Sequence, residues 1–189
     1  MKPFFIFLLS VFIFPIVSAK NLVEQPAVIH AADLPLYSKV YDEKRDPFKD
    51  AVAALALAKK TNRNVLIEVG GNWCSWCHKM DVFLEKNPEV YQSLHSKYVL
   101  LKISVSDSNE NEAFMKSLPP VFGYPHMYVS TSAGKMVLSK DTGELQRNGQ
   151  YNVTNWLTFL NEWQSQQHIA LTKQTKANTQ ENQKTEERL

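Results

Sequence analysis

The chain has 189 residues, of which 44% are hydrophobic and 21% are charged, and its formal net charge is +2. This length suits one domain with extra segments at its ends, because single domains usually hold roughly 100 to 200 residues. The composition is that of an ordinary globular protein, and so small a net charge gives no support to nucleic-acid binding or to an anionic membrane surface as partner.

The N-terminus predicts a signal peptide. Residues 4–17 are almost entirely apolar, Pro15 lies near the end of this run, and Ser18 and Ala19 are the small residues of a cleavage site. The run is shorter than the roughly 20 apolar residues that a membrane-spanning helix needs. We therefore expect residues 1–19 to be removed and the mature protein to be exported, without stable insertion in the membrane. An uncleaved N-terminal anchor is the alternative.

The next segment leads into a helix. Residues 20–45 have scattered prolines and no clear period, which we interpret as a leader strand or an extended N-terminal arm. Asp46 is a favourable N-cap and Pro47 suits the first helical position, so a helix is expected up to Lys60. Its apolar residues recur at helical spacing, as in Phe48, Val52, Leu55 and Ala56.

A strand then precedes the two cysteines of the chain. Residues 65–69 are nearly all apolar and rich in β-branched side chains, which predicts a strand buried on both faces, with Glu68 as the exception. The loop 70–72 follows, and the segment from Cys74 begins a helix. Residues 98–105 predict a second buried strand. The cysteines are therefore expected at a strand-to-helix turn in a β-α-β unit.

The rest of the chain alternates helices and strands. We expect a short helix from Asn87, a helix over 109–117, a hairpin of strands 126–129 and 136–138, and a helix over 153–163. From Gln164 the chain is polar and offers too few apolar residues to offset its ordering entropy. We predict a single α/β domain over residues 46–165 and a disordered polar tail over residues 166–189.

Cys74 and Cys77 are the only cysteines, and two residues separate them. A bridge between them closes a very small loop and adds little stability through chain entropy, so redox chemistry explains the pair better. At the first turn of a helix, Cys74 would face backbone N–H groups and the positive end of the helix dipole, which favour the thiolate. We predict that Cys74 is the attacking sulfur and that Cys77, one turn further, resolves the mixed disulfide.

Two other chemistries also fit this segment. Residues 74–78 read Cys-Ser-Trp-Cys-His, which matches the C-x-x-C-H attachment signature of c-type haem. Alternating strands and helices favour redox cysteines over haem. Zinc would have two thiolates and His78 but no second cysteine pair. We expect no metal and no cofactor besides the disulfide. A haem electron carrier and a binding module with incidental cysteines remain alternatives.

The region from Tyr41 to Trp163 resembles the thioredoxin superfamily, and more narrowly its secreted bacterial branch with Gly-Gly-Asn-Trp-Cys-x-Trp-Cys-His. The resemblance rests on Asp46-Pro47-Phe48, on the strand 65–69, on residues 70–78 and 102–105, and on Gly123-Tyr124-Pro125. It implies a thioredoxin-like fold, with a central mixed β-sheet flanked by helices. It also implies disulfide exchange with protein or peptide partners in the periplasm or outside the cell, and an unidentified partner that recycles the pair.

The resemblance assigns substrate binding to three residues. Pro125 corresponds to the cis proline that lies opposite the cysteines. Tyr124, directly before it, would bind a substrate chain as an added strand beside the sulfur atoms. Trp73 would shield Cys74 and offer an apolar contact surface.

Two further residues are implied as a proton relay. Glu68 lies six residues before Cys74, where thioredoxins usually have a buried acidic residue, and a carboxyl group in an apolar strand should have a raised pKa. It would accept the proton of Cys77 through water. Lys102 matches its partner in the family. Alternatively, Glu68 and Lys102 form only a buried structural pair.

Three positions depart from thioredoxins proper. Ser75-Trp76 stand where thioredoxins have Gly-Pro, Val82 replaces a proline, and His126 replaces the threonine that commonly follows the cis proline. These departures leave the direction of electron flow open.

Overall fold

The computed structural model describes residues 28–164 and the single residues 176 and 183. The predicted signal peptide (residues 1–19) and the start of the arm lie outside the described residues. So does the predicted polar tail, apart from the two single residues. None of the helices within residues 28–164 is long and apolar enough to cross a membrane.

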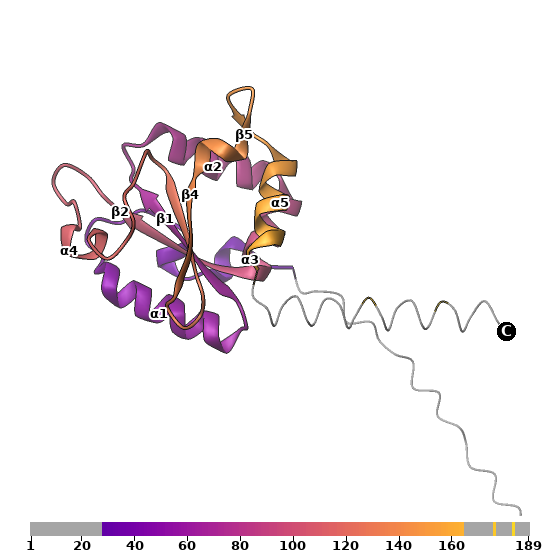
Figure 1. The fold of residues 1–189 in the computed structure, drawn as a ribbon, viewed down its shortest axis with the longest axis horizontal. Helices are drawn as coiled ribbons and strands as arrows, with labels where there is room; N and C mark the ends of the chain where they lie inside the picture. Colours follow the sequence, from indigo (N-terminus) through magenta and orange to yellow (C-terminus); the bar gives the residue numbers. More distant parts are fainter. Residues whose placement is uncertain (1–27, 165–175, 177–182, 184–189) are drawn as a thin grey trace, which may run out of the picture.

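A four-stranded sheet of order β2-β1-β3-β4 forms the centre of the fold. Figure 1 shows this sheet between the helices. Its strands are β1 (Asn64–Gly70), β2 (Tyr98–Ser104), β3 (His126–Ser130) and β4 (Met136–Asp141). β1 pairs in parallel with β2 and antiparallel with β3, and β3 pairs antiparallel with β4. Every residue of β1, β2 and β3 is buried, as their apolar runs predict. The predicted mixed sheet is confirmed.

Helices cover both faces of this sheet. Helices α2 (Ser75–Lys86), α3 (Pro88–Lys97) and α5 (Val153–Glu162) pack against the face that carries Leu66 and Leu100. Helices α1 (Pro47–Lys60) and α4 (Glu112–Met115) pack against the opposite face, which carries Val65 and Val99. Successive strand residues alternate between these two cores because the side-chain period of a strand is two. Glu68 therefore points to the same face as Leu66, toward α2.

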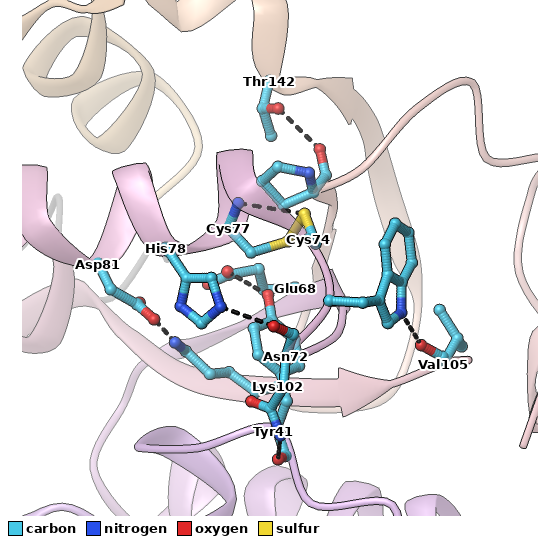
Figure 2. Close-up of a disulfide and its surroundings, with 12 residues drawn as sticks. Tyr41, Glu68, Asn72, Cys74, Cys77, His78, Asp81, Lys102, Val105 and Thr142 are labelled. Atoms are coloured by element: carbon cyan, nitrogen blue, oxygen red, sulfur yellow. Dashed lines mark hydrogen bonds and ion pairs between the residues drawn. A yellow bond between two sulfur atoms is a disulfide. The ribbon is translucent and has the colours of Figure 1, made fainter. Parts of the chain in front are cut away.

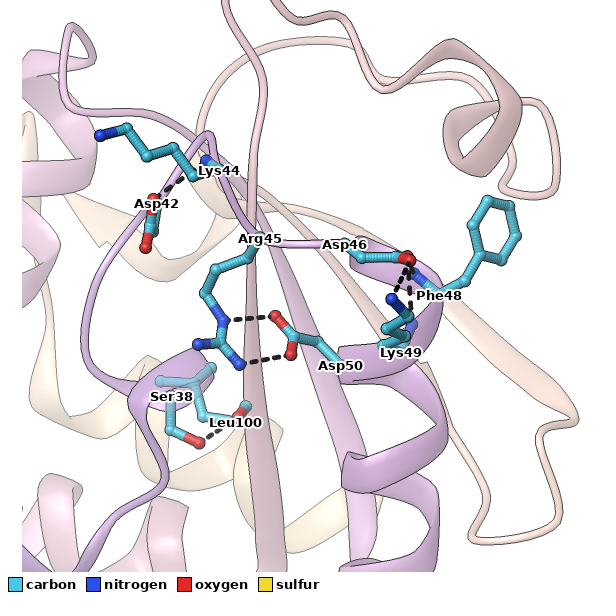
Figure 3. Close-up of polar contacts among 9 residues, drawn as sticks. All are labelled: Ser38, Asp42, Lys44, Arg45, Asp46, Phe48, Lys49, Asp50 and Leu100. Carbon is cyan, nitrogen blue, oxygen red and sulfur yellow. Dashed lines mark hydrogen bonds and ion pairs between the residues drawn. The ribbon is translucent and has the colours of Figure 1, made fainter.

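Helix α1 begins as predicted, but its buried face differs from the expectation. The Asp46 side chain accepts hydrogen bonds from two backbone N–H groups of the first turn (Figure 3). Phe48 and Val52 are 50% and 68% exposed, whereas Ala54 and Ala58 are fully buried against the sheet. The small alanine side chains allow the helix axis to lie close to the strands, so the larger apolar residues are left outside.

Two short elements differ from the predictions. Helix α4 has only four residues. Asn111, directly before it, adopts a left-handed conformation with φ 49°, so the helix begins at Glu112 and not at the predicted Asn109. A small hairpin of β5 (Gln146–Arg147) and β6 (Gln150–Tyr151) was not predicted. Its turn is Asn148-Gly149, with φ values of 54° and 72°, which is the Asn-Gly signal of a two-residue hairpin.

The described part of the arm, residues 28–45, contains two 3₁₀ turns rather than a strand. These are η1 (Ala31–Asp33) and η2 (Leu36–Ser38). The hydroxyl of Ser38 donates to the carbonyl of Leu100 in β2, and Arg45 makes two hydrogen bonds to the carboxylate of Asp50 in α1 (Figure 3). The arm is therefore attached to the domain along its described length.

His95 of α3 predicts a loss of stability in acid. Its side chain is buried, and burial, with smaller contributions from Arg63 and Lys102, lowers its pKa from 6.5 to about 4. The unfolded chain therefore binds more protons than the folded protein between these values, so stability falls as the pH decreases through this window by roughly 3 kcal/mol. In urea titrations at several pH values, His95→Gln should remove this part of the slope. The exposed-site control His30→Gln should keep it, and an unchanged slope in His95→Gln would contradict the assignment.

Candidate active site

The two cysteines lie where β1 leads into α2, as predicted. Cys74 is the N-cap of α2 and forms a disulfide with Cys77, with the two Cα atoms 5.3 Å apart (Figure 2). The backbone N–H of Cys77 donates to Cys74 Sγ at 3.1 Å. The same N–H and the positive end of α2 would favour a thiolate at Cys74 after reduction. Only 3% of Cys74 is exposed and Cys77 is fully buried, so an incoming sulfur meets Cys74 first.

Trp73 and Tyr124 form an exposed aromatic pair next to Cys74. Trp73 Nε1 donates to the carbonyl of Val105 at 2.6 Å, which fixes the indole ring, while 55% of the residue is exposed. Its ring contacts the ring of Tyr124 edge-on, with centroids 5.2 Å apart. The pair gives an exposed apolar surface beside Cys74.

The Tyr124–Pro125 peptide bond is cis, as the resemblance predicts. The carbonyl of Pro125 accepts a hydrogen bond from Thr142 Oγ1 at 2.7 Å. His126, the next residue, pairs with Val69 of β1. Val69 lies near the C-terminal end of β1, and the chain continues from there to the cysteines. The register therefore places Pro125 and the cysteine turn at the same end of the paired strands β1 and β3.

Glu68 lies in the protein interior below the cysteines. It is 1% exposed, and one carboxyl oxygen accepts a hydrogen bond from the hydroxyl of Tyr41, a residue of the arm. Lys102 is directly opposite Glu68 in the β1–β2 register, but its ion pair is with Asp81 of α2, at 2.5 Å. Its Nζ also lies 4.8 Å from the centre of the Tyr41 ring. The sequence therefore predicted Glu68 and Lys102 as neighbours and missed Asp81 and Tyr41.

Asp81 could have been found from the sequence, whereas Tyr41 could not. Asp81 follows Cys77 by four residues and so lies on the same face of α2, where a polar residue directed toward the core calls for a partner. Tyr41 belongs to an arm without periodicity, and only the three-dimensional path of the arm brings its ring to the cysteines.

The buried charges alter one another's pKa. Burial raises the pKa of Glu68, and Asp81 adds to this effect, whereas Lys102 and the Tyr41 hydrogen bond oppose it. Burial works to lower the pKa of Lys102, but the nearby Glu68 and Asp81 leave it above its usual value. Burial and Glu68 raise the pKa of Tyr41 well above its usual value, so this hydroxyl keeps its proton and acts as a donor.

The three residues of the C-x-x-C-H signature, Cys74, Cys77 and His78, contact other protein atoms in this structure. The Cys74 and Cys77 sulfur atoms are bonded to each other, and the His78 ring contacts the Asn72 carbonyl through Nε2 at 2.7 Å. Within residues 28–164, no three or more His, Cys, Asp or Glu side chains are grouped so that they could hold a metal ion.

The fold and the disulfide turn define the class: this is a thiol-disulfide oxidoreductase of thioredoxin-like fold.

Comparison with known proteins agrees with this class. Residues 46–130 match the family described as Thioredoxin-like, in agreement with the fold that the resemblance predicted. A disulphide isomerase from Xylella fastidiosa Temecula1 has 26% sequence identity and a TM-score of 0.54, over 70% of this chain and 98% of that chain.

Further similarity concerns the fold alone. The C-terminal domain of DsbD from Neisseria meningitidis, in both its oxidised and its reduced form, has 20% identity and a TM-score of 0.50. The match covers 63% of this chain and 97% of that domain. No curated protein shows significant sequence similarity to the chain.

Proposed function

We propose that the protein exchanges disulfides with protein or peptide substrates, with Cys74 as the attacking and Cys77 as the resolving sulfur. The observation that supports this proposal most strongly is the position of the disulfide at the start of α2. There, Cys74 Sγ accepts a hydrogen bond from the Cys77 N–H, and Cys74 is the less completely buried of the two cysteines.

Each exchange transfers two electrons. In the reducing direction, the Cys74 thiolate attacks a substrate disulfide, forms a mixed disulfide and releases one substrate thiolate. Cys77 then loses its proton and attacks Cys74 Sγ, which closes the Cys74–Cys77 disulfide and releases the second substrate thiolate. The two protein thiols are oxidised and the substrate disulfide is reduced. The oxidising direction uses the same steps in reverse.

The proton of Cys77 passes to Glu68 in this proposal. Glu68 is buried on the α2 side of β1, and burial raises its pKa, which brings a carboxyl group closer to the range of a useful general base. Once Glu68 is protonated, Lys102 and Asp81 remain beside it as an ion pair without net charge. The proton then returns to the released thiolate or to solvent.

The substrate would lie across the exposed aromatic pair. Trp73 and Tyr124 offer apolar contacts, and the backbone of Tyr124 would pair with an extended substrate segment. We further propose that the protein acts after export, in the bacterial periplasm or outside the cell, because residues 1–19 have the pattern of a signal peptide. The similar disulphide isomerase supports a protein substrate, and no cofactor beyond the cysteine pair is assigned.

Trapping of the intermediate tests the assigned roles. Cys77→Ser leaves the attacking thiol in place but removes the resolving thiol, so mixed disulfides with substrate proteins should accumulate as bands on non-reducing gels that dithiothreitol removes. The control Cys74→Ser/Cys77→Ser should give none. Absence of these bands in the Cys77→Ser protein incubated with scrambled or oxidised substrate proteins would contradict the proposal.

The direction of exchange is measured separately. Equilibration of Cys74–Cys77 with glutathione buffers gives the reduction potential. A value near roughly −270 mV indicates a reductant, and one near roughly −120 mV indicates an oxidant.

A further inference from the structure

Tyr41 brings part of the arm to the active site from outside the region that matches the family, which begins at residue 46. It is 5% exposed, and it forms one buried cluster with Cys74 and Cys77. The backbone around it is fixed, because Asn72 Nδ2 donates to the Tyr41 carbonyl at 3.1 Å. Its side chain therefore has a defined place beneath the disulfide turn.

The hydroxyl of Tyr41 is close to both Glu68 and the resolving sulfur. It donates a hydrogen bond to Glu68 Oε1 (Figure 2). A Cβ atom placed on Gly70 would lie 2.8 Å from this hydroxyl oxygen and 2.5 Å from Cys77 Sγ. The Tyr41 hydroxyl oxygen and Cys77 Sγ therefore lie next to the same small space beside Gly70, the last residue of β1. The hydroxyl keeps its proton, so it is a donor to Glu68 throughout the reaction.

We propose that Tyr41 is a positioning residue, whose hydroxyl fixes the Glu68 carboxyl and favours its ionised form, ready to accept the proton of Cys77. This inference rests on the proposed disulfide exchange. No proton or electron is transferred through Tyr41. Its hydrogen bond holds the acceptor in place and stabilises the charge that the acceptor must carry before the proton arrives.

The other charged groups near Glu68 come from each element packed around it. Lys102 on β2 opposes the effect of burial on the pKa of Glu68, whereas Asp81 on α2 adds to it. The β3 residue opposite Glu68 is Met127, which is uncharged, and Tyr151 of β6 also interacts with the Glu68 charge. Lys102 is in turn influenced by Asp81 and by Glu85 of α2.

The sign of the expected pH effect follows from these groups. The Tyr41 hydrogen bond lowers the pKa of Glu68, so its removal raises that pKa further. Less Glu68 is then ionised at any given pH, and the loss of proton acceptor is largest in acid. At high pH Glu68 is ionised with or without Tyr41, and the difference disappears.

The variant Tyr41→Phe tests the proposal through the pH profile of insulin reduction with dithiothreitol as electron donor. On the acid limb of the profile we expect a rate about tenfold lower than that of the unmodified protein, because a hydrogen bond to a charged group is lost. The two rates should converge as the pH rises. The control Tyr37→Phe changes another buried tyrosine of the arm, which packs in the core on the α1 side of the sheet. It should keep the normal profile.

A uniform decrease at all pH values, or an unchanged profile, would overturn the proposal. In a Glu68→Gln background, Tyr41→Phe should produce no further change in the shape of the profile.

A direct titration separates this inference from the proposed function. In protein with ¹³C-labelled glutamate, the carboxyl resonance of Glu68, assigned by its loss in Glu68→Gln, should titrate at higher pH in Tyr41→Phe than in the unmodified protein. An unchanged midpoint would refute the role of Tyr41 whatever the activity. Insulin reduction that does not depend on Cys74 would refute the proposed function, while a shifted Glu68 midpoint would still support the positioning role.

Discussion

In the Cys74→Ser variant, insulin reduction is expected to fall to the rate of dithiothreitol alone. A serine hydroxyl at neutral pH is a far weaker nucleophile than a thiolate. Cys77 cannot replace the lost sulfur, because it is fully buried. The measurement is the turbidity of precipitating insulin B chain over time.

A matched substitution separates chemistry from damage to the helix start. Ser75→Ala changes the next residue, which is exposed at the first position of α2, and keeps both sulfur atoms. It should retain most of the turnover. If Cys74→Ser kept the activity of the unmodified protein, the cysteines would not be the source of that activity and the proposed function would be refuted.

Signals that act over a few residues predicted much of this fold. The N-cap and proline at the start of α1 and the apolar runs of β1 and β2 depend on local backbone preferences and on burial, so the residues themselves contain the information. The buried face of α1 was not predictable in this way. A hydrophobicity pattern favours large side chains, whereas close approach of a helix to a sheet favours alanine.

The site was predicted only as far as the motif and its resemblance extend. The two cysteines lie close together in the sequence, so their pairing could be predicted. Glu68 could be predicted because it lies six residues before Cys74, where the family has a buried acidic residue. The ion pair of Lys102 depends on where α2 crosses the sheet, which brings in Asp81. Tyr41 lies 27 residues before the carboxyl group that it contacts, and no periodic pattern connects the two. Long-range polar contacts of this kind require the packed structure.

Gly70→Ala is expected to lower the free energy of unfolding of the oxidised protein by about 2 kcal/mol, as overpacking of a buried site does. The added Cβ would lie 2.5 Å from Cys77 Sγ and 2.8 Å from the Tyr41 oxygen. Neither neighbour is free to move, because the disulfide holds the sulfur atom and Glu68 holds the hydroxyl. Urea titration gives the change.

The control for this substitution is Gly123→Ala, because a Cβ on Gly123 would have no atom within 4 Å. Equal stabilities of the two alanine variants would show that the space around Gly70 is not restricted. The Tyr41→Phe background provides a sharper comparison. Loss of the hydroxyl removes one of the two closest contacts and leaves the sulfur contact, so Gly70→Ala should destabilise that background less, though still measurably. A glycine at this position is therefore required by the Tyr41 hydroxyl and the Cys77 sulfur atom, which both lie next to Gly70.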